Sequence, residues 1–191
     1  TEGYYCPPGS TSSRERKCGN ASVYCPLGSG TPTVAPPGYY TVNGEMVIGQ
    51  ISTVISDEET RAHAVICPKG FYCLNGIKKP CPRGTYGSEK GLSTPNCSGD
   101  VDPGYWSEEG AVSARSRKCF PGRYSSIPGS TSGECQGSCL AGYYCPPASI
   151  SSSQKHCGNA KFFCPEGSHE LMIQSIKLEE SKKDHQSSSC C

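Results

Sequence analysis

Large apolar side chains are scarce in this chain. Leucine, isoleucine, valine and phenylalanine together number 27 of 191 residues, beside one tryptophan and two methionines. That share lies well below the roughly 20% that ordinary globular domains need for burial. A single large hydrophobic core is therefore excluded, and something else must stabilise the fold.

Long apolar runs and blocks of like charge are absent too. No stretch approaches the roughly 18–20 apolar residues that cross a bilayer, so no membrane span is expected in this segment. The formal net charge is +1 and the basic residues are dispersed, so the sequence shows no cluster of Lys and Arg that would indicate nucleic-acid binding.

Catalytic and metal-binding signatures are missing as well. No Cys-x-x-Cys motif occurs, and Cys135 and Cys139 form the only cysteine pair at a spacing that zinc sites use. His156 adjoins Cys157, but its counterpart in the repeat described below is Lys17, so the module does not need an imidazole there. We predict no catalytic residue, no metal and no cofactor, and we do not expect an enzyme.

Cysteine, glycine, proline and tyrosine are abundant instead, with 15, 23, 16 and 11 residues. Each disulfide lowers the entropy of the unfolded chain and contributes on the order of 2–4 kcal/mol to stability. A set of disulfides would thus offset the thin core, and it would persist only in an oxidising compartment, which predicts an extracellular or cell-surface location. The candidate disulfide cysteines are Cys6, Cys18, Cys25, Cys67, Cys73, Cys81, Cys97, Cys119, Cys135, Cys139, Cys145, Cys157 and Cys164.

An internal repeat links the two ends of the chain. Residues 3–29 return as residues 142–168, with 17 of 27 positions identical. An active site is normally built once, whereas a copied motif indicates a structural module. Cys139 precedes Cys145 by six residues, and the matching position would precede Thr1, so we expect the chain to begin inside a module. The cysteines of the two copies correspond in order: Cys6, Cys18 and Cys25 to Cys145, Cys157 and Cys164.

A phrase of proline, glycine and then aromatic residues recurs, as in residues 67–73, 81–86 and 119–124, and it returns with alanine in place of proline in residues 139–145. Proline presets φ and glycine adopts positive φ, so the phrase predicts a turn, and the aromatic residues favour a short strand. The predicted fold class is small and disulfide-rich: an extended tandem array of short β-hairpins and irregular loops with little helix. Only residues 47–65 leave strand and helix open.

These patterns divide the chain into six segments. Residues 1–40 form a cysteine-rich module truncated at its start, 41–65 an insertion or linker, and 66–98 a second cysteine-rich module. A degenerate module without cysteines, 99–118, precedes a third cysteine-rich module, 119–168. Residues 169–191 are a divergent polar tail, either a short helix or disordered, that ends in Cys190 and Cys191.

Spacing alone leaves the disulfide connectivity open. Cys81–Cys97 and Cys119–Cys135 share a separation of 16 residues and are the favoured local loops. When the two loops are aligned by these cysteines, Cys139 and Cys145 fall opposite Val101 and Ser107. Because both cysteines are absent from the earlier copy, Cys139–Cys145 is a candidate bridge. Local pairing suits modules that contact only their neighbours. A rival alignment instead gives Cys145–Cys157, Cys6–Cys18 and Cys73–Cys81.

Two acceptor sequons predict N-linked glycans at Asn20 and Asn96. In the second copy of the repeat, Asn159 keeps the asparagine while Lys161 replaces the serine of the sequon. We therefore expect the asparagine itself to serve the turn. The Ser/Thr/Pro stretch 29–37 is either a plain linker or a site for O-linked sugar.

The sequences GYYCPPGSTS (residues 3–12), VYCPLGSGTP (residues 23–32) and GYYTV (residues 38–42) resemble the ephrin-receptor-like cysteine-rich repeat. The resemblance covers most of residues 1–168 and fails at Val101 and Ser107. It implies a rod-like extracellular architecture, as in very large surface proteins of protists, algae and oomycetes, some of them components of flagellar hairs or surface coats. It implies no catalytic residues.

The sequence thus predicts a segment of a large secreted or surface structural glycoprotein that builds an extracellular filament, sheath or coat. The expected partners are further copies or other extracellular structural proteins, together with covalent glycans. The alternative is the stalk or ligand-binding ectodomain of a cell-surface receptor or adhesin.

Overall fold

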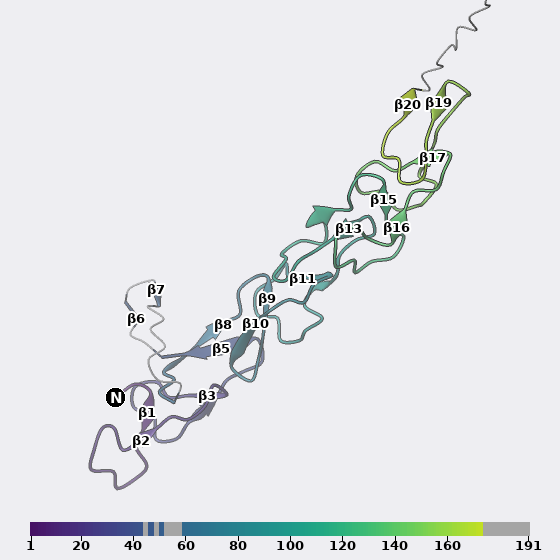
Figure 1. Ribbon diagram of the computed structural model, residues 1–191. Helices are drawn as coiled ribbons and strands as arrows, with labels where there is room; N and C mark the ends of the chain where they lie inside the picture. Colours follow the sequence, from purple (N-terminus) through teal and green to yellow (C-terminus); the bar gives the residue numbers. More distant parts are fainter. Residues whose placement is uncertain (44–45, 48–49, 52–58, 174–191) are drawn as a thin grey trace, which may run out of the picture.

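The computed structural model describes residues 1–43, 46–47, 50–51 and 59–173. The chain forms an elongated rod along which the hairpins follow one another in sequence order (Figure 1). The described residues contain no helix, and every sheet has two strands. The predicted fold class, a disulfide-rich array of short hairpins, is therefore confirmed.

Nine consecutive antiparallel hairpins make up the described rod, and we number them from the N-terminal end. A further pair, β6 (Met46–Val47) with β7 (Gln50–Ile51), lies within the connection of the third hairpin. The nine are β1 (Tyr4–Tyr5) with β2 (Arg16–Lys17), β3 (Val23–Tyr24) with β4 (Thr33–Val34), β5 (Tyr39–Val42) with β8 (His63–Ile66), β9 (Phe71–Leu74) with β10 (Ile77–Pro80), β11 (Thr85–Tyr86) with β12 (Gly99–Asp100), β13 (Tyr105–Trp106) with β14 (Arg117–Lys118), β15 (Arg123–Tyr124) with β16 (Gly137–Ser138), β17 (Tyr143–Tyr144) with β18 (Lys155–His156), and β19 (Phe162–Phe163) with β20 (Met172–Ile173).

The hairpins are finer units than the segments expected from the cysteine pattern. Tyr39 pairs with Ile66, so residues 43–62 are the connection inside hairpin three. The described part of 47–65 contains strands and an irregular segment, 59–62, but no helix, while residues 48–49 and 52–58 lie outside the described residues. The predicted tail begins inside hairpin nine, and its residues 174–191 lie outside the described residues.

The buried residues concentrate at two positions of each hairpin. The first junction position is the residue that follows the second strand, and the second junction position is the third residue counted from the start of the first strand. From the end of hairpin one to the start of hairpin nine, every such residue is buried. The first junction positions are Cys18, Ala35, Cys67, Cys81, Val101, Cys119, Cys139 and Cys157; the second junction positions facing them are Cys25, Thr41, Cys73, Gly87, Ser107, Ser125, Cys145 and Cys164.

Main-chain hydrogen bonds join each hairpin to the next in a repeated pattern. In eight successive hairpins the amide at the second junction position donates to a carbonyl in the loop of the following hairpin, at 2.8–3.2 Å. Cys145 to Ser168 and Ser107 to Ser130 are two examples. The glycine before the first strand adds a bond, because its amide donates to the carbonyl at the second junction position of the next hairpin, as Gly122 does to Cys145 at 2.9 Å.

Each hairpin also contacts the second hairpin along the rod. The Gly129 amide, in hairpin seven, donates to the carbonyl of Val101, which closes hairpin five, at 3.0 Å. The Gly167 amide in hairpin nine donates in the same way to Cys139 at 2.9 Å. Contacts between hairpins therefore extend past the immediate neighbour. The hairpins are too thin to separate the units on either side of them.

Close approach explains why glycine precedes most of the first strands. Gly122 has a φ of 80°, in the left-handed region, and a Cβ built on it would collide with the carbonyl of Gly167, two hairpins further on. Any larger residue would therefore meet both backbone strain and a steric clash. The same approach occurs between Gly3 and Thr60, Gly38 and Gly91, Gly70 and Gly110, Gly84 and Gly129, and Gly104 and Ala148.

We predict that Gly122→Ala destabilises the rod much more than Gly142→Ala. Gly142 has nearly the same φ, 84°, but nothing lies within 4 Å of its Cβ position. The control should lose only the left-handed strain, about 1–2 kcal/mol, whereas Gly122→Ala should lose roughly 1–3 kcal/mol more through overpacking. Thermal unfolding of the oxidised proteins measures the difference. Equal losses would refute the second-neighbour contact.

Candidate functional site: the module junctions

Among the described residues, six disulfides lie at the junctions between successive hairpins, and the cysteine side chains themselves form most of the buried core. Four of them join the two junction positions directly, at sequence separations of 6 or 7: Cys18–Cys25, Cys67–Cys73, Cys139–Cys145 and Cys157–Cys164. Each therefore ties the end of one hairpin to the first strand of the next. Because the cross-link and the backbone hydrogen bonds coincide, each junction is fixed twice.

The other two disulfides use a loop cysteine instead. Cys81–Cys97 and Cys119–Cys135, the favoured local loops, are both present. Cys97 and Cys135 each have a φ of 51°, in the left-handed region, which turns the loop back toward the junction. At the first of these junctions, Gly87 occupies the second junction position, and a Cβ there would lie 2.8 Å from the Cys81 sulfur. Glycine at position 87 thus makes room for the bridge.

The candidate bridge Cys139–Cys145 is a disulfide in the structure, and the rival alignment is wrong. Cys73 pairs with Cys67 and not with Cys81; Cys18 pairs with Cys25 and not with Cys6; and Cys157 pairs with Cys164 and not with Cys145. The rival pairs join the two strands of one hairpin, whereas the structure cross-links successive hairpins. Spacing alone could not separate the two schemes, because the separation of 12 residues in Cys6–Cys18 also repeats in Cys145–Cys157.

Hydroxyl groups replace sulfur at the two junctions that lack a disulfide. Val101 and Ser107 are fully buried at the positions that Cys139 and Cys145 occupy two hairpins later. Ser107 Oγ donates to the Thr85 carbonyl at 2.9 Å and accepts the Gly84 amide at 3.1 Å. At the other such junction, Thr41 Oγ1 donates to the Ala21 carbonyl at 2.6 Å. The architecture thus tolerates the loss of a cross-link where a buried hydroxyl supplies hydrogen bonds.

Cys6 is the one unpaired cysteine among the described residues. It occupies the second junction position of hairpin one, is partly exposed, and its thiol donates to the Ser12 carbonyl at 3.2 Å. Its place in the pattern matches Cys25 and Cys145. Cys190 and Cys191 lie outside the described residues.

The two predicted glycan acceptors are exposed. Asn20 Oδ1 accepts the Ser22 amide at 2.9 Å, and Asn159 Oδ1 accepts the Lys161 amide at 3.0 Å in the same way. The asparagine therefore caps the same turn in both copies, whether or not a sequon is present. Asn96 precedes the bridged Cys97, and the Ser98 hydroxyl of that sequon is hydrogen-bonded to Ser88.

Ion pairs lie on the surface of the rod. Arg115 Nε donates to Asp102 at 2.8 Å, and this hydrogen bond, followed by the Coulombic attraction of the pair, raises the pKa of the guanidinium above its ordinary value. Such exposed pairs contribute little to stability.

Within the described ranges no three histidine, cysteine or acidic side chains gather as metal ligands. No helix in that part of the chain is long and apolar enough to span a membrane.

Comparison with family models gives no match, and no curated protein matches the sequence.

We predict that Val101→Cys combined with Ser107→Cys creates an additional disulfide. The two residues occupy junction positions that are bridged at Cys139–Cys145, where the Cα atoms are 5.8 Å apart. The new loop should raise the free energy of unfolding by about 2 kcal/mol. Mass spectrometry without reductant detects the bridge. Each single variant is the control: labelled with a maleimide after unfolding without reductant, it should show one reactive thiol more than the wild-type protein, which already carries the free thiol of Cys6. Two additional reactive thiols in the double variant would contradict the equivalence of the two junctions.

Proposed function

We propose that this chain is a length of a stiff extracellular rod, a segment of a large structural glycoprotein that builds a filament, sheath or coat. The overlapping contact between each hairpin and the two that follow it carries the proposal. A chain joined only by single connections would bend at every module border. Here bending at one border also strains the contacts that pass over it.

The chemistry of the junctions supports a mechanical role. Six covalent cross-links and a repeated set of main-chain hydrogen bonds supply the cohesion that the thin core lacks. The disulfides indicate an oxidising environment, which suits secretion or the cell surface. Rod-like architecture is also what the resemblance to the ephrin-receptor-like repeat implies, and we propose membership of that class on the motifs alone.

Electron microscopy of the oxidised protein tests the proposal. We expect straight rods that assemble, as concentration rises, into filaments with a fixed subunit rise, and that collapse after reduction with dithiothreitol. Persistent monomers that capture a soluble ligand would support the receptor or adhesin stalk instead. A reduced chain that keeps the dimensions of the rod would contradict the role of the disulfides.

We further propose N-linked glycans at Asn20 and Asn96. Because Asn159 lies in the same turn as Asn20, Lys161→Ser should complete a sequon there and add one glycan, while Ser22→Ala should remove one. Expression in a secreting eukaryotic cell followed by N-glycosidase treatment and intact mass measures both changes. Lys161→Ala is the control and should add no glycan. A secreted wild-type protein without N-linked sugar would overturn the proposal.

A further inference from the structure

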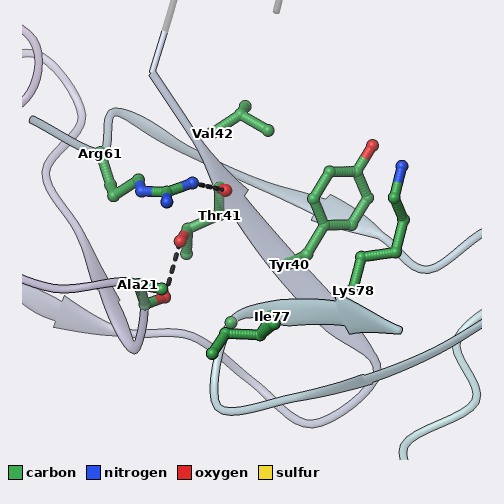
Figure 2. A pocket seen from close by; sticks show the side chains of 8 residues that line it. Ala21, Tyr40, Thr41, Val42, Arg61, Ile77 and Lys78 are labelled. Atoms are coloured by element: carbon green, nitrogen blue, oxygen red, sulfur yellow. Dashed lines mark hydrogen bonds between the residues drawn. The ribbon is translucent and has the colours of Figure 1, made fainter. Parts of the chain in front are cut away.

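A hollow of about 280 Å³ lies where hairpins two, three and four meet (Figure 2). Its walls include Tyr40, Thr41 and Val42 of β5 and Ile77 and Lys78 of β10, and Arg61 extends into it from the end of the long connection in hairpin three. Its volume lies near the lower end of ligand pockets, roughly 300–1,000 Å³. It therefore suits one small chemical unit and not an extended macromolecular surface.

A departure from the junction pattern creates the hollow. Ser22 replaces the glycine that precedes the first strand in most hairpins, and its amide donates to Asn20 Oδ1 at 2.9 Å instead of to the next hairpin. The carbonyl of Thr41, at the second junction position, is left for Arg61 Nη1, which donates to it at 2.6 Å. A cationic side chain thus stands where other junctions place a neutral backbone amide.

Two basic side chains, Arg61 and Lys78, line the hollow, and none of its lining residues is acidic. The Lys78 ammonium lies 4.8 Å from the ring centroid of Tyr40 and 5.3 Å from that of Phe71, and no carboxylate among the described residues pairs with it. The rings orient the ammonium without neutralising it. An anionic group placed beside Lys78 would therefore gain a charged hydrogen bond.

The backbone groups around the hollow are already paired, which argues against an added peptide strand. The Thr41 amide donates to the Gly76 carbonyl at 2.9 Å, and the Thr41 carbonyl accepts from Arg61. The Ala21 carbonyl accepts from Thr41 Oγ1. Strand addition needs a free row of amides and carbonyls. What remains for recognition is positive charge, the phenol of Tyr40 and the apolar surface of Val42 and Ile77.

We propose that this hollow binds an anionic sugar unit, a uronate or a sulfated sugar, of an extracellular acidic polysaccharide. The carboxylate or sulfate lies against the Lys78 ammonium, and the apolar face of the sugar ring lies against Ile77 and the edge of Tyr40. The inference does not depend on whether the rods assemble into filaments. It gives the rod a point of attachment to a surrounding polysaccharide.

Isothermal titration of the full oxidised chain tests the proposal, with oligogalacturonate and dextran sulfate oligosaccharides as probes. Neutral dextran oligosaccharides of equal length should not bind. Lys78→Gln should weaken binding of an acidic probe about tenfold, since a charged hydrogen bond is lost, and Lys78→Arg should restore most of it. Binding of oligogalacturonate alone identifies a uronate, and binding of dextran sulfate alone identifies a sulfated sugar.

Lys155→Gln is the matched control. Lys155 is an exposed lysine over an aromatic ring, 5.8 Å from the centroid of Tyr144, but it belongs to hairpin eight, away from the hollow. The Lys155→Gln substitution removes the same charge as Lys78→Gln but should leave the affinity for the acidic probes unchanged. Equal weakening by Lys78→Gln and Lys155→Gln would overturn the site in favour of diffuse attraction. No binding of either acidic probe, or equal binding of an oligoglutamate that also requires Lys78, would overturn the sugar assignment.

Discussion

The buried main-chain hydrogen bonds between successive hairpins are the constraint on which this fold depends. A two-residue strand pair buries almost nothing by itself and is not stable alone in water. It becomes stable here because the amide at the second junction position is satisfied only by the next hairpin. Each hairpin thus completes the hydrogen bonding of the one before it, and the rod cannot be divided into independent domains.

Sulfur has a supporting role in this arrangement. The pair Val101 and Ser107 retains the complete hydrogen-bond pattern of its junction without a cross-link. At Cys81 and Cys119 the bridge is made to a loop cysteine while the backbone pattern stays the same. The backbone geometry therefore defines the junction. The disulfides reduce the number of conformations open to the unfolded chain, so less conformational entropy is lost on folding. This reduction offsets the small contribution of the scarce apolar residues.

The sequence reveals the class of fold because turn residues and cysteine spacing are local signals. Glycine followed by one or two aromatic residues predicts the start of most hairpins, and the equal spacing of Cys81–Cys97 and Cys119–Cys135 predicts two local loops. The second-neighbour contact of Gly122 with Gly167 was not predictable, because it depends on the thickness of the hairpin between them and leaves no periodic signal. Nor was the hollow, since it arises when Ser22 replaces one glycine and Arg61 takes over its hydrogen bond.

The overlap between second neighbours has a consequence for how such a rod fails under load. A hairpin inside the array can open only after contacts on both sides are released, whereas one at an end has partners on a single side. Rupture under tension or heat therefore starts at a terminus or at an interruption of the pattern and advances inward as a front. Lengthening such an array therefore increases its resistance to unfolding more than lengthening a chain of independently folded modules would, because the interior hairpins open only after those at the ends.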